Sequence, residues 1–449
     1  MNSATNATTD APARFHPASS PDYVPREPLG ELQSHRLRQV VARAYEHVSL
    51  FRQRMNKHNL TPADVGGIDD LHKLPFTVKS DLVDTYPTGM LAVAIQDVVR
   101  LYPPGGTAAG PVVVAHTRRD LDVWTELLVR CLASCGIHRG DVVQNACGRN
   151  RFTDGLALHR AAEALGATVV PVSGGDTSHQ VMVMKDFGVS TICSTPNYFL
   201  YLVERAEKMG VDLSELPLRA GVFIDEPWSD AMRRRIEESA GIKAYDVYGL
   251  PEILGPGIGV ECCRQDGLHI FEDHFYPEIV DPDSGEPLPD GREGQLVLTT
   301  LSKEAMPMIR YRTPDLAAIV AEPCGCGRTM RRIRRTVRQS DEMFVIQGAS
   351  VFPSQIEAAL LAVQGSLPSY QIVLWQERGV DQAEVQIEVT PQIFSDQVGA
   401  MESLQTRLAS EIEQTVGIRV PVRLVEPHSI DRGGDQGKRV VDRRGTQAT

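Results

Sequence analysis

The chain has 449 residues, of which 42% are hydrophobic and 23% charged, and its formal net charge is −12. This composition is typical of a soluble globular protein, and the length favours a large domain joined to a smaller one. The excess of negative charge argues against a nucleic-acid partner and against binding to an anionic membrane surface. Because no run of about 18 apolar residues occurs, we expect no transmembrane helix and no membrane partner.

The first segment, residues 1–29, is rich in Ser, Thr, Ala and Pro and is predicted to be a disordered tail. It lacks the basic region and apolar core of a signal peptide. With eight cysteines in a chain of this length, we expect a cytoplasmic protein whose thiols are free or bound to metal. Residues 30–59 carry apolar side chains near helical spacing, which predicts one long helix.

Strands are predicted at 98–102 and 112–115, on either side of a Gly-rich turn. Such a turn can hold phosphate groups with its backbone N–H groups, or it can be a plain turn without a ligand. From 121 to 248, predicted helices alternate with apolar strands, which indicates parallel β-α units. Residues 351–425 alternate in the same way and predict a small second domain.

Four side chains could form a metal site. Cys262, His269, Cys324 and Cys326 supply three thiolates and an imidazole, the ligands of a closed tetrahedral Zn²⁺ site with a structural role. Cys263 could replace Cys262 as a ligand. The alternative is that all these thiols are free, and Cys-x-Cys is a tighter spacing than the usual Cys-x₂-Cys.

Three blocks between residues 244 and 315 carry a resemblance to a known family. They are Tyr-Gly-x-x-Glu (248–252), Glu-Asp-His-Phe-x-Pro-Glu-Ile (272–279) and Lys-Glu-Ala-Met-Pro-x-Ile-Arg-Tyr-Arg-Thr-x-Asp (303–315). Together they resemble phenylacetate–CoA ligase, a branch of the adenylate-forming (ANL) enzymes. The resemblance extends over about residues 30–445, and several long blocks in the right order are more specific than one short motif.

This resemblance implies an α/β fold in two parts. A large adenylate-forming domain with parallel and mixed sheets would occupy residues 30–341, and a ferredoxin-like α+β lid would occupy 342–449. The implied enzyme activates an aryl or acyl carboxylic acid with ATP and Mg²⁺ and then forms a thioester with CoA. Relatives are commonly dimers, so a homodimer is possible.

The resemblance also implies roles for individual residues. Glu252 would coordinate Mg²⁺ near the phosphates, and Asp315 would bind both ribose hydroxyls. Lys438 would be the lid lysine that bridges the substrate carboxylate and the α-phosphate. The other nucleotide-binding residues would be Thr107, Asp225, Glu226, Tyr248, Gly249 and Arg338.

Several positions depart from the family pattern. The turn Pro-Gly-Gly-Thr-Ala-Ala-Gly-Pro at 104–111 lacks two Ser hydroxyls, one Thr hydroxyl and the Lys that relatives place there. Ile224 and Asp225 replace the Gly-Ala on which the adenine ring packs. A β-branched side chain and a carboxylate are steric and electrostatic obstacles at that position.

The hinge and the lid differ as well. Gln339 replaces the family's arginine, so Arg338 is the candidate for its role, and the hinge aspartate is present as Asp341. A gapless match places Gln436 where relatives have the lid lysine, and Lys438 follows two residues later.

Three functions are compatible with this pattern. The first is an acid–CoA ligase that uses ATP. The second is an ATP-independent enzyme on the same fold that acts on a pre-activated acyl thioester. The third is a homologue that binds a ligand or partner without catalysis. ATP binding separates the first from the other two, and CoA binding separates the second from the third.

Overall fold

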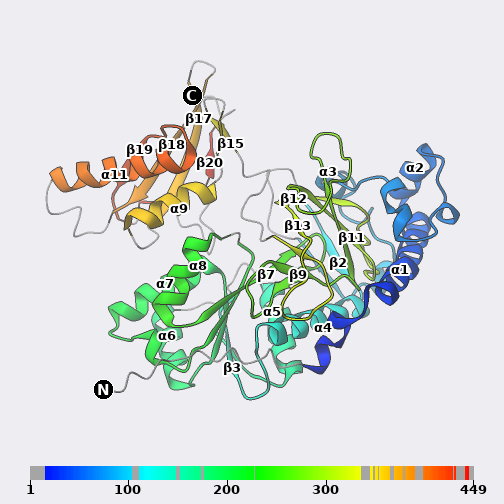
Figure 1. The fold of residues 1–449 in the computed structure, drawn as a ribbon, viewed down its shortest axis with the longest axis horizontal. Helices are drawn as coiled ribbons and strands as arrows, with labels where there is room; N and C mark the ends of the chain where they lie inside the picture. The colour runs from blue at the N-terminus through cyan, green and yellow to red at the C-terminus, as the bar shows by residue number, and fades with distance from the viewer. Residues whose placement is uncertain are drawn as a thin grey trace.

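The computed structural model describes residues 16–103, 111–147, 152–172, 176–226, 228–334, 344–346, 349–351, 353–364, 369–377, 380–389, 398–427, 429–430 and 440–443. A large α/β body is followed by a smaller C-terminal unit, which contains α9 and α11 and lies at the upper left in Figure 1. This arrangement confirms the predicted fold class. No helix in these ranges is long and apolar enough to cross a membrane.

A nine-stranded sheet forms the centre of the body, in the order β13-β14-β9-β8-β7-β6-β5-β3-β4. Its strands β3 to β7 pair in parallel, as the alternation of helices and strands predicted. These strands are β3 (Val142–Asn145), β4 (Thr168–Pro171), β5 (Thr191–Ser194), β6 (Ala220–Ile224) and β7 (Lys243–Leu250). Most side chains of β5 and β6 are buried, as expected for parallel strands covered on both faces.

Helices connect the parallel strands. They are α5 (Phe152–Leu165), α6 (Thr177–Asp186), α7 (Pro196–Lys208) and α8 (Asp230–Ala240), and α4 (Arg118–Ser134) precedes β3 in the chain. Ser229 caps the start of α8, because its hydroxyl accepts a hydrogen bond from the Met232 N–H at 3.2 Å. Thr117 caps α4 in the same way.

The rest of the body is largely antiparallel. In the central sheet, β8 (Gly255–Glu261), β9 (Leu268–Ile270), β14 (Arg332–Ile333) and β13 (Ile319–Val320) follow β7. A three-stranded sheet contains β10 (Phe275–Val280), β11 (Gly294–Thr300) and β12 (Tyr311–Ala317). The hairpin of β1 (Arg100–Tyr102) and β2 (Val114–His116) flanks the Gly-rich turn, which lies outside the described ranges.

The N-terminal segment differs from two predictions. Residues Pro17–Tyr23 form the short helix η1, and the Asp22 side chain is fully buried, so the part of the predicted tail from residue 16 onward is ordered. The single helix predicted over 30–59 is two helices, α1 (Arg26–His47) and α2 (Ser49–Lys57), because the chain is extended at Val48. A short helix α3 (Lys79–Asp84) follows.

The C-terminal unit has its own hydrophobic core and a four-stranded sheet in the order β19-β18-β17-β20. Its elements are β15 (Phe344–Ile346), β16 (Ala349–Val351), α9 (Pro353–Gln364), β17 (Tyr370–Glu377), β18 (Val380–Glu388), α11 (Val398–Val416), β19 (Val422–Val425) and β20 (Val440–Asp442). Leu361 of α9 packs in a hydrophobic cluster that also contains Met232 and Ile236 of α8, so the unit contacts the body there.

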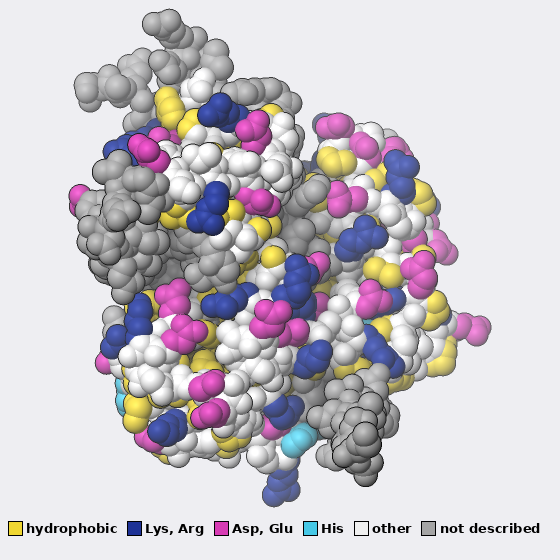
Figure 2. Space-filling view, turned by 60° about the vertical axis from the view of Figure 1, so that its left-hand side comes forward, with side chains coloured by type: hydrophobic (Ala, Val, Ile, Leu, Met, Phe, Trp, Pro, Cys, Tyr) yellow, Lys and Arg dark blue, Asp and Glu magenta, His cyan; other side chains and the backbone are white. Residues whose placement is uncertain are grey.

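Positive and negative side chains are interspersed on the face shown in Figure 2. Such mixing differs from the basic stripe of a nucleic-acid-binding surface.

Candidate active site

Two predicted nucleotide-site residues lie in contact. Tyr248 is near the end of β7, where the strand leaves its last parallel partner, and its hydroxyl donates a hydrogen bond to the carboxylate of Asp315 on β12. Asp315 is buried. Burial and the neighbouring Asp315 raise the pKa of Tyr248 well above its usual value, so its hydroxyl stays a donor.

The turn after β7 presents Glu252 between two lysines. The Lys79 ammonium, at the start of α3, lies 3.8 Å from the Glu252 carboxylate. On the other side, buried Lys303 donates to the backbone carbonyls of Ile253 at 2.6 Å and Glu252 at 3.5 Å. Burial lowers the pKa of Lys303 to about 8. Neither lysine had a role in the sequence-based prediction.

The predicted adenine loop follows β6. Asp225 has φ 72°, a left-handed conformation that Asp tolerates better than most residues. Glu226 accepts a hydrogen bond from the Asn197 side chain at 2.7 Å, which ties the loop to the start of α7. Helix α7 begins at Pro196, directly after its cap residue Thr195, which follows the end of β5.

An aromatic stack includes residues of β1 and β2, the two strands on either side of the Gly-rich turn in the sequence. The Tyr102 and His116 ring centroids are 6.0 Å apart, and those of His116 and Trp124 are 5.3 Å apart. Burial raises the pKa of Tyr102, and the negative charges of Asp154 and Glu252 add to this rise, so its hydroxyl stays protonated. Burial lowers the pKa of His116 to about 2, which keeps its imidazole neutral.

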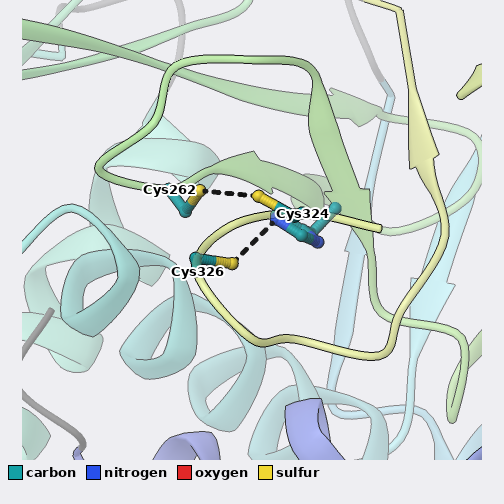
Figure 3. A group of neighbouring side chains, drawn as sticks. Cys262, Cys324 and Cys326 are labelled. Carbon is teal, nitrogen blue, oxygen red and sulfur yellow. Dashed lines mark hydrogen bonds between the residues drawn. The ribbon is translucent and has the colours of Figure 1, made fainter. Parts of the chain in front are cut away.

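The four predicted metal ligands come together in space. The ligand atoms of Cys262, His269, Cys324 and Cys326 all lie within 4.8 Å of one another, and Figure 3 shows the thiols pointing to a common centre. The Cys262 and Cys324 sulfurs are 3.7 Å apart, and the Cys326 sulfur is 3.4 Å from His269 Nε2. A tetrahedral zinc ion with Zn–S bonds of about 2.3 Å would place its sulfurs about 3.8 Å apart. The donor set and its spacing thus fit zinc.

The surroundings of this cluster also suit a metal. His269 Nδ1 lies 3.4 Å from the Met330 carbonyl, a contact that would leave Nε2 facing the metal. Hydrogen bonds from Cys262 and His269 lower the pKa of Cys326 and favour the thiolate that metals bind. Cys263 is exposed and outside the group, so Cys262 is the better ligand candidate.

The remaining predicted residues fall outside the described ranges. They are Thr107 of the Gly-rich turn, Arg338 and Asp341 at the predicted hinge, and Lys438 with Gln436 in the C-terminal unit. Gly249 is described, and its backbone packs tightly against residues Gly255 and Pro256, where a side chain would collide with the backbone. This explains the glycine of the Tyr-Gly-x-x-Glu block through packing.

Comparison with known proteins identifies the class. Residues 159–302 match the AMP-binding enzyme family, and residues 348–444 match the AMP-binding enzyme C-terminal domain. These are the two parts of an adenylate-forming enzyme.

Curated relatives narrow the identification to one family. The phenylacetate–coenzyme A ligase of Thermus thermophilus is 44% identical over 435 residues, covering 94% of this chain and 98% of the relative. The Pseudomonas putida protein of the same name is 42% identical and covers 93% and 94%. The chain therefore belongs to the phenylacetate–CoA ligase family.

A solved structure agrees along nearly the whole chain. The postadenylation state of 2-hydroxyisobutyryl-CoA ligase, in complex with an acyl-AMP, matches with a TM-score of 0.86 and 25% identity, covering 96% of this chain and 94% of that one. The thioesterification state of the same ligase gives a TM-score of 0.70. The arrangement of body and C-terminal unit is thus closer to the postadenylation state.

Proposed function

We propose that this protein is an ATP-dependent ligase that joins an aryl or acyl carboxylic acid to CoA. The observation that carries the proposal is the hydrogen-bonded pair of Tyr248 and Asp315 beside the turn that bears Glu252. Tyr248 lies on β7, Glu252 in the turn that follows it and Asp315 on β12, and in this proposal they form the part of a nucleotide site that holds ribose and a metal ion. The family relationship along the whole chain supports the same function.

In this proposal the substrate carboxylate attacks the α-phosphate of ATP and releases pyrophosphate, and the CoA thiolate then attacks the acyl-adenylate. Asp315 binds the ribose hydroxyls, and its carboxylate geometry suits two donors. Glu252 would hold Mg²⁺, which neutralises charge on the phosphates when bound. Lys438 of the C-terminal unit, residues 342–449, stabilises charge at the α-phosphate.

We propose that the phosphate site is weaker than in relatives that have the full set of phosphate-loop hydroxyls and Lys. Each missing charge-assisted hydrogen bond costs about 1.5–3 kcal/mol where it would form. The ammonium of Lys79 beside Glu252 is a nearby cation that offsets part of this loss. Thr107 and Arg338 complete the phosphate and ribose contacts in this proposal.

An aromatic acid such as phenylacetate is the substrate that the curated relatives suggest, since several at 41–44% identity carry that name. The ATP-independent alternative rests on Ile224 and Asp225, because the left-handed Asp225 places a carboxylate in the predicted adenine loop. Adenylation assays on wild-type protein separate the two functions.

We further propose a structural zinc ion on Cys262, His269, Cys324 and Cys326. A closed set of four protein ligands leaves no position for substrate, so the metal would stabilise the fold. It would tie the segment 324–331 to β8 and β9.

The proposed function is tested by pyrophosphate release with ATP, Mg²⁺ and a panel of aryl and acyl acids, followed by thioester formation with CoA. Acid-dependent release and an acyl-CoA product are expected. A protein that forms no adenylate but exchanges acyl groups between thioesters would support the ATP-independent alternative instead.

A further inference from the structure

We infer that Lys303 is a positioning residue for the Glu252 turn and sets the metal affinity of the ATP site through the backbone. The inference rests on the proposed function, since it concerns the residue that would hold Mg²⁺.

The Lys303 ammonium binds the turn directly. It donates to the Ile253 carbonyl at 2.6 Å and lies 3.5 Å from the Glu252 carbonyl, and only 5% of the residue is exposed. Among the described residues it forms no ion pair within 4.0 Å. Burying an ammonium without a close carboxylate is costly, so its hydrogen bonds to these carbonyls carry much of its compensation.

The backbone next to Lys303 is itself held by the start of α4. The Asp120 carboxylate accepts hydrogen bonds from the Glu304 N–H at 2.7 Å and the Ala305 N–H at 3.0 Å. It also accepts from the Thr117 N–H at 2.9 Å in the cap of α4. The backbone that follows Lys303 is therefore fixed to helix α4. Because Lys303 also donates to the carbonyls of the Glu252 turn, it holds that turn in a fixed position relative to α4.

Glu252 is consequently held from two sides by different groups. Lys303 engages its backbone from the buried side, while its carboxylate faces Lys79 at 3.8 Å. Because Lys303 hydrogen-bonds the carbonyls and not the carboxylate, it leaves the carboxylate oxygens to cations on the other side of the turn, where the Lys79 ammonium lies 3.8 Å from one of them. Outer contacts of this kind orient a ligand, and their loss commonly lowers metal affinity about 10–100-fold.

The test compares the Mg²⁺ dependence of ATP–pyrophosphate exchange in the wild type, Lys303→Met and Lys303→Arg. Lys303→Met removes the hydrogen-bond donors and the charge but keeps a side chain of similar length. The Mg²⁺ concentration that this variant needs for half-maximal exchange should rise about tenfold or more. The KM for the acid should change less than about twofold, and Lys303→Arg should recover part of the Mg²⁺ affinity. The control is Lys73→Met, whose lysine is half-exposed and pairs with Asp70.

A second measurement, Mn²⁺ binding in the presence of ATP by electron paramagnetic resonance, does not depend on turnover. Weaker Mn²⁺ binding by Lys303→Met than by the wild type supports the inference. It does so even if the wild type shows no ATP–pyrophosphate exchange, a result that would contradict only the proposed function. Equal metal constants in wild type and Lys303→Met overturn the inference and leave the function standing. If Lys303→Met is insoluble, the measurements are made on Lys303→Arg and Lys303→Gln. Metal affinities that are equal in these two variants and the wild type overturn the inference.

Discussion

The hydroxyl of Tyr248 donates a hydrogen bond to the carboxylate of Asp315, although 67 residues separate them in the chain. Tyr248 lies on the central sheet and Asp315 on the neighbouring three-stranded sheet, so the bond joins two sheets at the candidate nucleotide site. The phenol fixes the orientation of a buried carboxylate. A carboxylate held in place before a ligand arrives loses less entropy when it binds two hydroxyls.

The first prediction concerns this pair. Asp315→Ala removes both acceptors for the ribose hydroxyls, and its KM for ATP should rise by at least about tenfold, the equivalent of losing about 1.5–3 kcal/mol. Tyr248→Phe keeps the Asp315 carboxylate but removes the hydroxyl that orients it, so the KM for ATP should rise about three- to tenfold. Steady-state kinetics at saturating acid give both values.

The control for this pair is Tyr201→Phe, because Tyr201 is an exposed residue on α7. If Asp315→Ala left the KM for ATP unchanged while the protein stayed folded, the assignment of Asp315 to the ribose would be wrong.

Parts of the fold could be read from the sequence because local patterns determine them. The alternation of apolar strands and helices between 121 and 248 indicated parallel pairing, and β3 to β7 pair in that way. The four metal ligands were identified from their chemistry. Their proximity depends on β14 pairing with β9, where Arg332 lies opposite His269, and this pairing is a tertiary feature.

Other parts could not be predicted because no residue pattern encodes them. Lys303 acts on backbone carbonyls, which every residue has. Lys79 meets Glu252 only through the packing of α3 against the turn. The Asp22 carboxylate is buried in a Ser- and Pro-rich segment because it pairs with Arg130 and Arg328, which lie more than a hundred residues away along the chain.

The second prediction concerns zinc. Purified protein should contain about one zinc ion per chain, and Cys324→Ser should lose it, whereas Cys263→Ser should not. Because a closed site contributes to folding, the variant should melt on the order of 5 °C or more below the wild type. Elemental analysis and thermal unfolding measure these effects. Equal metal content in the wild type and Cys324→Ser would refute the site.

The third prediction follows from a link between this metal loop and the N-terminus. The Thr329 N–H donates to the Asp22 carbonyl at 3.0 Å, and Arg328 pairs with the Asp22 carboxylate at 3.1 Å. Zinc removal by a chelator should loosen this loop and expose residues 16–26 to proteolysis. Limited digestion followed by mass spectrometry would locate the cleavage, and protection that is unchanged after metal removal would speak against the link.

The fourth prediction concerns a buried ion network. Arg130 is fully buried and hydrogen-bonds with the carboxylates of Asp22, at 2.7 Å, and Asp273, at 2.9 Å. Arg130→Met removes one cationic partner from each of two buried carboxylates and should cost about 3–5 kcal/mol of unfolding free energy. Arg119→Met on the same helix removes an exposed arginine and should cost about 1 kcal/mol or less. Urea unfolding would detect the difference, and equal losses would contradict the network.

This network also predicts acid sensitivity. Burial alone would raise the pKa of Asp273, but His274 and Arg130 outweigh it and hold the pKa well below its usual value. A carboxylate with a lowered folded pKa contributes stability above its unfolded pKa of about 3.9, and this is lost as the pH falls through the folded value. Asp273→Asn should therefore show a shallower loss of stability below about pH 4 than the wild type. Identical slopes in the two proteins would exclude this contribution.

The fifth prediction distinguishes two lid residues. Lys438→Ala should slow adenylation about 10²–10³-fold, because the lysine supplies charge stabilisation at the α-phosphate. Gln436→Ala should be close to wild type. Single-turnover pyrophosphate release measures adenylation alone. The reverse pattern, with Gln436→Ala the damaging change, would favour the gapless match and remove Lys438 from the mechanism.

The measurement that tests the central claim most directly is calorimetric titration of the purified protein with ATP and Mg²⁺, followed by pyrophosphate release with aryl and acyl acids. Binding in the micromolar range with acid-dependent release is the predicted result, and it would mean that the altered phosphate turn is compensated elsewhere in the site. No binding at millimolar ATP would contradict the ligase function, and CoA titration would then decide between a thioester enzyme and a binding protein.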